Sequence, residues 1–425
     1  MATRILVGNN MIKMRELEDE SIDCIVTSPP YFGLRDYGTG KWEGGDPNCD
    51  HIESKNLKRD VSGGVGSKDL GTRGKQPSTS SSVMEYKIKC NKCNAIKIDY
   101  VWGGDENCEH EWSKAPPRRK RHPNDHTKGT LNQIASAPHL KETDSCHKCG
   151  GWMGGYGLEP TPEQYIKNTL LIFDELHRVL KPQGTVWWNI GDSYAMKSSA
   201  WGGSRGHNSI LKGTGLADKQ RRTGVCPDKL KSKDLMMIPA RVAIAVAEHG
   251  WYLRSEIIWH KPNPMPESVK DRPTSAHEKI YLFAKNRKYY YDADAVKEKA
   301  RTKPVVRNKS AEGYQADYPK GERFSEGERT YGDGYANKRN VWTVTTKPFK
   351  GAHFTVFPTD LIEPCIKAGC PKGGTVLDPF GGSGTTGLVA NNLGRDAILI
   401  ELNEEYVEIA KKRLNLGLFS EVKDG

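Results

Sequence analysis

The sequence predicts an α/β fold built on an open sheet. Two short apolar runs, residues 22–26 and 375–377, are each followed directly by a loop rich in proline or glycine. That pattern is typical of a buried strand that ends in a functional loop. The second loop leads into the run Thr385–Ala390, so strand, tight turn and helix follow one another as in half of a Rossmann-type unit. Because ligands of open α/β sheets bind at the carboxyl ends of the strands, both loops are candidate site segments.

Length and composition bound what surrounds that sheet. The chain has 425 residues, of which only 36% are hydrophobic, and it contains 44 glycines and 24 prolines. These values favour one well-formed domain with long polar loops or insertions. No apolar segment follows Met1, and no stretch approaches the roughly 20 apolar residues that span a bilayer. We therefore expect a soluble, cytoplasmic protein without a membrane partner.

The net charge of +11 is concentrated in two basic runs, residues 118–121 and 219–233. Such runs favour a polyanionic partner. A solvated face or a disordered basic loop would explain either run taken alone. Combined with the chemistry of the two loops, the charge favours nucleic acid.

The first loop, Thr27–Tyr31, combines a hydroxyl, two prolines and an aromatic ring. Consecutive prolines fix φ, lack N–H donors and keep the preceding residues out of the α region, so they hold the loop carbonyls rigidly. The Ser28 hydroxyl and the Pro29 carbonyl can accept hydrogen bonds from an exocyclic amino group, and Tyr31 offers a face on which a base can stack. A rigid turn leaving a strand would explain the same residues, so this loop is suggestive only in combination.

The second loop, Asp378–Gly384, suits a nucleoside cofactor that carries a cationic amino group. Its glycines let the backbone approach a ligand closely, and Asp378 offers a carboxylate at the strand end. The later strand Ala397–Ile400 ends at Glu401, an acid placed to accept hydrogen bonds from ribose hydroxyls. S-Adenosylmethionine fits both acids. The 3.6-residue stripe over residues 403–416 predicts a helix that covers the sheet.

Together the two loops predict the two halves of a methyl-transfer site. An exocyclic amino nitrogen is a poor nucleophile, because its lone pair is delocalised into the ring. Acceptors placed against its two protons would localise that lone pair and aim it at a sulfonium methyl group. A base inside a duplex cannot be reached, so the target would have to be flipped out, which costs roughly a few kcal/mol of unstacking. Stacking on an aromatic ring returns about 1–3 kcal/mol per base.

With these segments the chain resembles the β class of amino-group DNA methyltransferases, which make N4-methylcytosine or N6-methyladenine. In that class the catalytic loop precedes the cofactor loop, a circularly permuted order. The resemblance implies an S-adenosylmethionine-dependent, bacterial or phage-encoded enzyme that acts on double-stranded DNA with a flipped target base. Whether a cognate restriction endonuclease is a partner, and what the oligomeric state is, stay open. The resemblance assigns catalysis to Ser28, Pro29, Pro30 and Tyr31, and cofactor binding to Asn9, His353, Phe354, Asp378, Phe380, Gly382, Gly384, Thr385 and Glu401.

Further segments resemble the same family. Residues 173–182 read as a helix that leads into a strand at 184–192, and Arg254–Pro264 resembles the late strand and loop beside the target base. His353–Pro358 resembles the segment that lies over the cofactor. Relatives often have Gly-Asp where this chain has Gly8-Asn9, near the cofactor's adenine. Serine as the first residue of the catalytic loop leans toward cytosine N4, whereas aspartate leans toward adenine N6, and the adenine alternative stays open.

Residues 41–155 contain an internal repeat with the spacing of metal ligands. Trp42–His51 is echoed by Trp102–His110, and each copy is followed by a Cys-x-x-Cys pair. The simplest assignment is two closed, structural zinc sites, each with three thiolates and one imidazole. One site would use Cys49, His51, Cys90 and Cys93, and the other Cys108, His110, Cys146 and Cys149. Cross-paired half-sites, a single zinc, and free or singly buried cysteines are the alternatives.

These segments divide the chain into a catalytic domain and two additions. The catalytic domain would comprise residues 1–40, 156–290 and 346–425, the last of these binding the cofactor. A zinc-binding insertion would occupy 41–155. A target-recognition region at 291–345 is rich in aromatic and cationic residues that suit phosphate and base contacts, although a solvated surface segment would look similar.

Two rival functions remain at this point. An RNA or protein amino-group methyltransferase would share both loops, but those relatives usually place the cofactor loop first. A non-catalytic zinc protein that binds nucleic acid would explain the cysteines and the charge, but it leaves three residues without a role, namely Ser28, Asp378 and Glu401.

Overall fold

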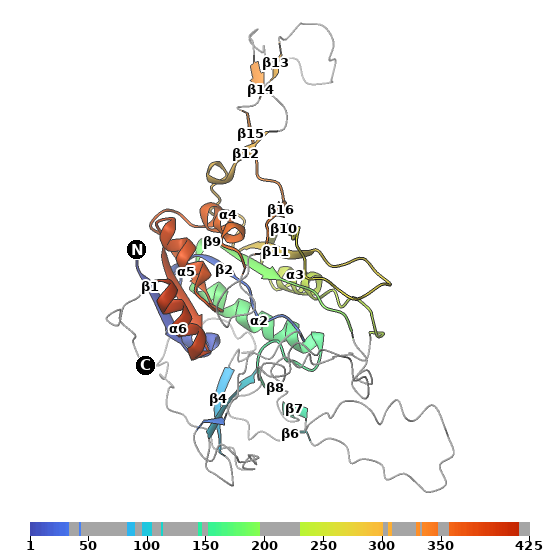
Figure 1. Ribbon diagram of the computed structural model, residues 1–425. Helices are drawn as coiled ribbons and strands as arrows, with labels where there is room; N and C mark the ends of the chain where they lie inside the picture. The colour runs from blue at the N-terminus through green and yellow to red at the C-terminus, as the bar shows by residue number, and fades with distance from the viewer. Residues whose placement is uncertain are drawn as a thin grey trace, which may run out of the picture.

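The computed structural model describes residues 1–33, 42–43, 83–89, 96–103, 112–113, 143–146, 152–195, 230–300, 305–307, 329–331, 334–346 and 357–415. Figure 1 shows a large central sheet covered by helices on both faces, with a smaller sheet at one end and a narrow two-stranded projection at the other. The α/β prediction is confirmed.

The central sheet has eight strands and is mostly parallel. Along the sheet the strands follow the order β1 (Thr3–Val7), β18 (Asp396–Glu401), β17 (Thr375–Asp378), β2 (Ile22–Thr27), β9 (Leu180–Ile190), β11 (His277–Ala284), β10 (Tyr252–His260) and β16 (Val341–Thr343). Neighbours from β1 to β9 are parallel, β11 is antiparallel to both β9 and β10, and β16 is parallel to β10.

The two predicted loops leave this sheet side by side. β17 pairs with β2 in parallel, with Val376 opposite Cys24 and Leu377 opposite Ile25. From β17 the chain passes through α5 (Thr385–Asn392) to β18 on one side, whereas from β2 it reaches β9 on the other side. The connections therefore diverge between β17 and β2. A crevice forms at such a topological switch point, outside the carboxyl ends of the strands, and it is where open α/β sheets bind ligands.

Helices cover both faces of the central sheet. One face packs against α1 (Asn10–Met14), α2 (Pro162–Val179) and α3 (Ile238–Glu248), and the other against α4 (Thr359–Gly369) and α5. The last helix, α6 (Glu404–Arg413), contacts β1 and β18. The sequence predicted a helix over residues 173–182, but α2 starts earlier and ends at Val179, and Lys181 and Pro182 belong to β9. Proline disfavours the α conformation in the residue before it, which explains the earlier end.

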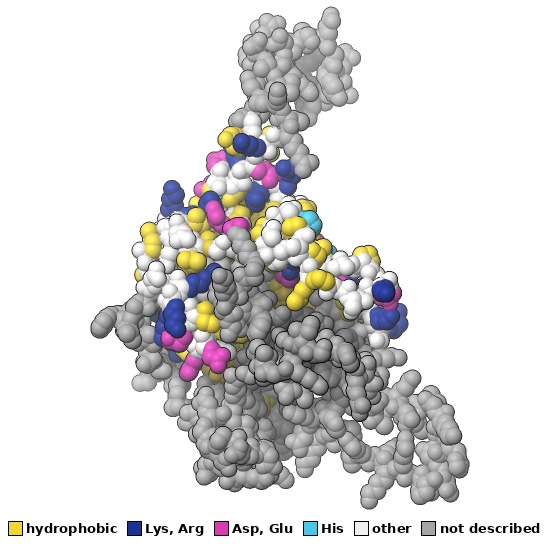
Figure 2. All heavy atoms as spheres, viewed as in Figure 1, with side chains coloured by type: hydrophobic (Ala, Val, Ile, Leu, Met, Phe, Trp, Pro, Cys, Tyr) yellow, Lys and Arg dark blue, Asp and Glu magenta, His cyan; other side chains and the backbone are white. Residues whose placement is uncertain are grey.

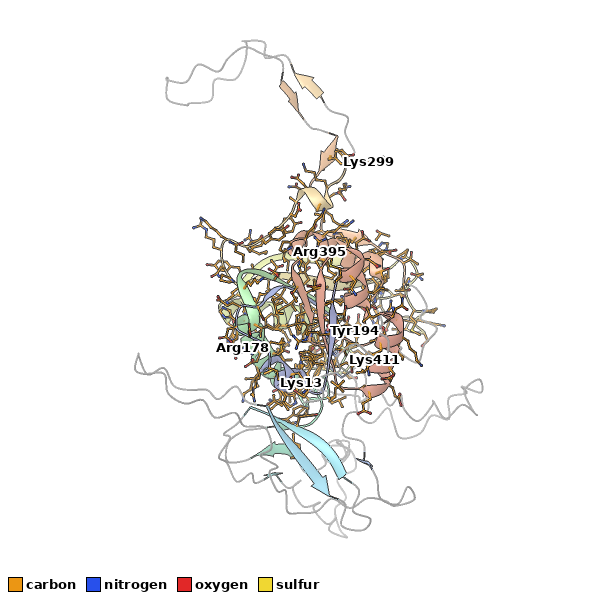
Figure 3. The ribbon with its side chains drawn as sticks, turned by 90° about the vertical axis from the view of Figure 1, so that its left-hand side faces the viewer. Lys13, Arg178, Tyr194, Lys299, Arg395 and Lys411 are labelled. Atoms are coloured by element: carbon orange, nitrogen blue, oxygen red, sulfur yellow. The ribbon has the colours of Figure 1, made fainter. Side chains whose placement is uncertain are left out.

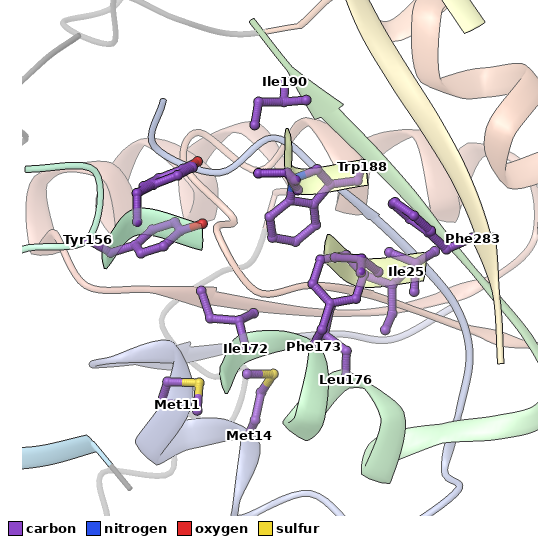
Figure 4. Close-up of a cluster of buried hydrophobic side chains, with 14 of the residues drawn as sticks. Met11, Met14, Ile25, Tyr156, Ile172, Phe173, Leu176, Trp188, Ile190 and Phe283 are labelled. Atoms are coloured by element: carbon purple, nitrogen blue, oxygen red, sulfur yellow. The ribbon is translucent and has the colours of Figure 1, made fainter. Parts of the chain in front are cut away.

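The start of α2 follows directly from its sequence. The Thr161 hydroxyl accepts a hydrogen bond of 3.1 Å from the Gln164 amide, and Pro162, which has no N–H to satisfy, occupies the first turn. Phe173 on this helix is fully buried, and its ring lies beside those of Trp188 and Phe283, at centroid distances of 4.9 and 5.3 Å (Figure 4). The Trp251 ring lies 5.4 Å from it. Such pairs contribute about 0.5–1.5 kcal/mol each beyond area burial, so they hold α2 firmly under β9 and β11.

A second sheet is formed by strands from residues 42–153. Its strands are β3 (Trp42–Glu43), β4 (Val83–Lys89), β5 (Ile96–Trp102), β6 (Trp112–Ser113), β7 (Thr143–Cys146) and β8 (Trp152–Met153). It is fastened near β8 by Trp102, whose indole N–H donates to the Gly154 carbonyl at 2.9 Å. Figures 1 and 3 agree that β4 and β5 lie at the end of the molecule opposite to β12 and β15.

The projection contains two short antiparallel ladders after η3 (Asp294–Val296). β12 (Glu298–Lys299) pairs with β15 (Tyr335–Ala336), and β13 (Val305–Arg307) pairs with β14 (Arg329–Tyr331). Lys299, in β12, is labelled in Figure 3 and marks the ladder of β12 and β15. The chain returns from the projection into β16 at the edge of the central sheet.

Several predicted residues lie outside the described part of the chain. They are His353, Phe354 and seven of the eight proposed zinc ligands; of Cys146, only its place at the end of β7 is described. Within the described residues no cluster of three or more His, Cys, Asp or Glu side chains could hold a metal ion. Among the described helices, none has the length and hydropathy of a membrane span.

Charged side chains are mixed on the visible surface. In Figure 2 the described Lys and Arg side chains lie among Asp and Glu side chains over the central domain and at the base of the projection. On this face the described residues therefore present no single basic patch.

Candidate functional site

A cleft opens where the two predicted loops leave the central sheet. Its empty volume, which includes the open solvent at its mouth, is about 1250 Å³. The cleft is lined by Gly8, Asn9, Asn10, Ser28, Pro29, Pro30, Tyr31, Tyr100, Trp102, Gly154, Gly155, Tyr156, Leu158, Phe357, Asp378, Pro379, Phe380, Gly381, Gly382, Ser383, Thr385, Ile400, Glu401, Leu402, Asn403 and Tyr406.

Asp378 joins the two loops at the base of the cleft. Its Oδ1 accepts hydrogen bonds from the Thr27 hydroxyl at 2.6 Å and the Phe380 amide at 3.0 Å, and its Oδ2 accepts from the Thr386 hydroxyl at 2.6 Å. The side chain is almost completely buried, and this burial raises the pKa of the carboxyl to about 6. The sequence predicted Asp378 as a partner for a cofactor ammonium group. The geometry adds a second role, because the same carboxylate joins three segments: β2, α5 and the second loop, residues 378–384, which we call the glycine loop.

The glycine loop forms a close-fitting backbone turn against β18 and α6. A Cβ at Gly381 would lie 2.9 Å from Leu399 Cβ, and a Cβ at Gly384, where φ is +80°, would lie 3.0 Å from Ala410 Cβ. Side chains at these positions would therefore displace the loop. The Gly382 amide donates to Glu401 Oε2 at 2.8 Å, so the end of β18 also holds the loop.

Glu401 is partly exposed at the wall of the cleft. Its second oxygen accepts from the Asn403 amide at 2.8 Å, and burial raises the pKa of its carboxyl. Each carboxylate oxygen has two lone pairs, so both oxygens retain acceptor capacity toward the cleft. A glycine-rich turn, followed by an acid with spare lone pairs, fits the amino acid and ribose parts of S-adenosylmethionine.

Asn9 and Asn10 lie on the wall beside the glycine loop, and their side chains differ in availability. The Met11 amide at the start of α1 donates to Asn9 Oδ1, the helix cap, and also lies 2.9 Å from Asn10 Oδ1. Asn10 is 7% exposed, and its Nδ2 is a buried donor without a partner among the described residues. The sequence predicted a cofactor contact for Asn9 alone. Nothing local in two adjacent asparagines indicates that the amide of the second would stay unpaired among the described residues.

The catalytic loop is fixed by α2. The Tyr165 hydroxyl donates to the Pro30 carbonyl at 3.0 Å, whereas the Pro29 carbonyl has no hydrogen-bond partner within the described part of the chain. Ser28 is half-buried and lines the cleft. The loop therefore brings Ser28 and Pro29 to the wall of the same cleft.

Tyr31 is held by residues of β9 and β11. Its hydroxyl donates to Glu278 Oε2 at 2.8 Å and lies 3.2 Å from Asn189 Oδ1, and the Ser28 hydroxyl donates to it at 3.3 Å. A Cβ at Gly191 would be 2.7 Å from the tyrosine ring, so only glycine leaves room for the ring here. Glu278 was missed by the sequence analysis, because nothing local in β11 marks it as a neighbour of residue 31.

The second sheet contributes an aromatic wall to the cleft. Tyr100 and Trp102 come from β5, and Tyr156 follows β8. The rings of Tyr156 and Phe380 are stacked at 5.7 Å with an interplanar angle of 20°, and Trp102 lies 5.5 Å from Tyr156. The sequence analysis gave this segment a structural role only. The repeated Trp of residues 42 and 102 was the one signal available.

Glu159 supports the catalytic loop from beneath. It is fully buried, and its carboxylate accepts from the Gly157 amide at 2.8 Å and from Asn168 Nδ2 at 3.0 Å. The Gly157 carbonyl in turn accepts from the Gly33 amide at 2.8 Å, two residues after Tyr31. Burial raises the pKa of Glu159 to about 7.

This buried acid predicts a pH-dependent stability. The pKa of Glu159 is raised from 4.5 in the unfolded chain to about 7 in the folded protein, so its stabilising contribution is complete at low pH and is lost as the pH rises through 7. The unfolding free energy should therefore fall with rising pH, by up to about 1.4 kcal/mol per pH unit for this one group. Urea unfolding of Glu159→Gln should show a flatter dependence, and part of the remaining slope belongs to Asp378.

A control variant is Glu248→Gln, because Glu248 is exposed at the end of α3. It should keep the wild-type slope. An equal flattening in both variants would contradict the assignment to Glu159.

The structure brings most of the predicted site residues to one cleft. Ser28, Pro29, Pro30, Tyr31, Asn9, Asp378, Phe380, Gly382, Thr385 and Glu401 all line it, and Gly384 lies next to them at the start of α5. Of the segment predicted to lie over the cofactor, Phe357 is described and lines the cleft.

The chain is similar in sequence to known DNA methyltransferases. A family of N6/N4 methyltransferases, described as DNA methylase, matches residues 22–412. The chain is 45% identical over 261 residues to the Type II methyltransferase M.Cfr9I of Citrobacter freundii, covering 61% of this chain and 74% of that protein. It is 41% identical over 261 residues to the Type II methyltransferase M.SmaI of Serratia marcescens, covering 61% of this chain and 77% of that protein. Among solved structures, the PvuII DNA methyltransferase (cytosine-N4-specific) aligns over 100% of this chain and 89% of its own, with a TM-score of 0.45 and 15% identity.

Proposed function

Because this chain belongs to the family of N6/N4 DNA methylases, S-adenosylmethionine-dependent enzymes that methylate an exocyclic amino group in DNA, we propose that it makes N4-methylcytosine at a specific DNA site. The observation that carries the proposal is the position of Ser28 and Pro29 on the same cleft as the glycine loop, joined to it by the Thr27–Asp378 hydrogen bond of 2.6 Å. The family model spans both loops, which argues against the alternative of a non-catalytic zinc protein.

In the proposed mechanism the glycine loop, Phe380 and Glu401 would hold S-adenosylmethionine. When bound, S-adenosylmethionine supplies an electrophilic methyl group on a sulfonium. The Ser28 hydroxyl oxygen and the Pro29 carbonyl oxygen would accept hydrogen bonds from the two N–H groups of the target amino group, which localises the nitrogen lone pair and points it along one direction. Tyr165 holds the Pro30 carbonyl, so the rigid loop is already in its working geometry before the base arrives.

The choice of cytosine rests on Ser28. A neutral hydroxyl at the head of the Pro-Pro loop leans toward cytosine in the class that this chain resembles, whereas a carboxylate leans toward adenine. The order of the loops, with Ser28 before Asp378, supports the β class rather than the RNA and protein methyltransferases. We also propose that the target base is flipped out of the duplex, since an amino nitrogen that is paired and stacked inside a duplex cannot be reached by catalytic groups.

The projection and the second sheet have proposed roles at the two ends of the site. The two ladders of the projection, β12 with β15 and β13 with β14, fall in the predicted target-recognition region, residues 291–345. They extend from the edge of the central sheet, and we propose that they contact DNA. The Type II methyltransferases named above motivate the proposal that recognition is specific for one site and that a restriction endonuclease is the partner.

The zinc sites also remain a proposal. Along the sequence, Cys90 and Cys93 fall between β4 and β5, whereas Cys146 ends β7 and Cys149 falls between β7 and β8; both strand pairs are antiparallel. The Cys-x-x-Cys spacing is that of a zinc half-site. Metal analysis of the purified protein should find about two zinc ions per chain if both four-ligand sites form. A zinc-free protein that methylates DNA normally would exclude them.

The function is tested by the chemical identity of the product. Unmethylated DNA is incubated with the protein and S-adenosylmethionine, digested to nucleosides and analysed by mass spectrometry. N4-methylcytosine is the expected product. N6-methyladenine would retain the mechanism and overturn the assignment of the base, whereas methylation of RNA alone would overturn the assignment of the substrate.

A further inference from the structure

A chain of hydrogen bonds runs from the catalytic loop to the far strands of the sheet. The Ser28 hydroxyl donates to the Tyr31 hydroxyl at 3.3 Å, which donates to Glu278 Oε2 at 2.8 Å, and Lys261 Nζ contacts Glu278 Oε1. The loop follows β2, Glu278 belongs to β11 and Lys261 follows β10. Of the residues in this hydrogen-bond chain, the proposed mechanism uses only Ser28 and Tyr31.

We propose that Glu278, held by Lys261, is a positioning residue that sets the direction of these hydrogen bonds, so that Ser28 faces the target amino group as an acceptor. This inference rests on the proposed function of Ser28. The proposal requires a carboxylate at residue 278. This residue is the second of β11 and is remote in sequence from both loops.

The direction follows from the donor and acceptor capacities of each group. An ionised carboxylate only accepts, and a tyrosine hydroxyl has a single proton. The contact of 2.8 Å places that proton toward Glu278, so the Tyr31 oxygen is left to accept from Ser28. With its own proton committed to Tyr31, the Ser28 oxygen turns only lone pairs toward the cleft.

Asn189 reinforces the same direction. Its Nδ2 donates to the Lys279 carbonyl at 3.1 Å, which turns its Oδ1 toward Tyr31 at 3.2 Å. The hydroxyl proton of Tyr31 therefore has two acceptors other than Ser28, namely Glu278 Oε2 and Asn189 Oδ1. A Ser28 hydroxyl that instead donated into the cleft would oppose the amino protons of the base and would no longer localise the nitrogen lone pair.

Lys261 keeps the carboxylate in place. The side chains of Lys261 and Glu278 are 17% and 18% exposed, and the Lys261 ammonium also lies 4.2 Å from the centroid of the Trp259 ring. Because Lys261 contacts Oε1, the other oxygen of Glu278 is turned toward Tyr31.

The experiment compares methyl transfer in a single turnover with binding. Glu278→Gln keeps the shape of the side chain, but its amide can donate to Tyr31 and reverse the chain. We expect its single-turnover rate to fall by about 10- to 100-fold, less than the roughly 10²- to 10³-fold loss from removing one polarising group outright. The dissociation constants for S-adenosylmethionine and for DNA should stay unchanged. Tyr31→Phe, which removes the intermediate hydroxyl without disturbing the Lys261–Glu278 pair, should show the same pattern.

A matched control exists on the neighbouring strand. Glu256 accepts from the Tyr281 hydroxyl at 3.1 Å and from Lys279 Nζ at 3.0 Å, the same three residue types without a link to Ser28. Glu256→Gln should leave the rate unchanged. An equal loss in Glu256→Gln would overturn the inference.

A double-mutant cycle separates positioning from a general structural effect. If Glu278 acts through Ser28, then Glu278→Gln should cause no further loss once Ser28 is alanine. Losses that multiply would overturn the inference, as would an unchanged rate in Glu278→Gln. Wild-type protein that binds the cofactor but methylates no base in DNA would overturn the proposed function, whereas an active wild type with an unaffected Glu278→Gln variant would overturn only the role of Glu278.

Discussion

Ser28→Ala is expected to lower the single-turnover rate of methyl transfer by about 10²- to 10³-fold, because it removes one of the two acceptors that face the amino group. Ser28 makes no hydrogen bond to the glycine loop; its hydroxyl donates to Tyr31. The affinity for S-adenosylmethionine, measured by calorimetric titration, should therefore be unchanged. The rate is measured with enzyme in excess over DNA, so that product release does not contribute.

The control for this prediction is Ser21→Ala. Ser21 lies just before β2 and donates to the Glu18 carbonyl, away from the cleft. It should retain the wild-type rate. A Ser28→Ala protein with a normal rate, or with cofactor affinity reduced as much as its rate, would contradict the division of labour between the two loops.

Asp378→Ala is expected to abolish cofactor binding and to destabilise the fold. It leaves the Thr27 and Thr386 hydroxyls and the Phe380 amide without their acceptor, and each buried donor left unpaired costs about 1–3 kcal/mol. Chemical unfolding should report a loss of several kcal/mol, and calorimetry should detect no binding.

Asp378→Asn separates the two roles of the carboxylate. The asparagine oxygen can still accept from Thr27 and Phe380, and Thr386 can donate instead to the Val26 carbonyl, which is 3.4 Å away. If Asp378 acts mainly by joining the loops, the amide variant should retain most of the cofactor affinity. If the carboxylate pairs with the ammonium group, asparagine should bind as poorly as alanine.

The local parts of the site could be predicted from the sequence, and its remote partners could not. Residues 22–26 and 375–377 form strands as expected, because apolar runs before Pro-rich and Gly-rich turns are a local signal. Their pairing brings Ser28 and Asp378 to one cleft. Glu278, by contrast, reaches Tyr31 only because β11 lies two strands away from β2 in the folded sheet, an order that no local pattern encodes.

Two other differences have the same kind of cause. The helix over residues 173–182 ends earlier than predicted, because a proline at 182 outweighs the apolar periodicity. The aromatic wall of Trp102 and Tyr156 depends on how the second sheet packs onto the cleft. Spacing of cysteines in that segment indicates metal ligands but says nothing about which rings face the central domain.

The hydrogen bond between Thr27 and Asp378 joins positions 351 residues apart, and it has a consequence for how the protein is made. During synthesis β2 emerges early, but its neighbour β17 is among the last strands to leave the ribosome. Until then β2 has an unpaired edge in what will become the middle of the sheet, and such edges invite pairing with other chains. Contacts of this long range also slow folding. Truncated chains that end before residue 375 should therefore aggregate rather than accumulate as partly active enzyme, so that methylating activity arises only from chains synthesised through their last strands.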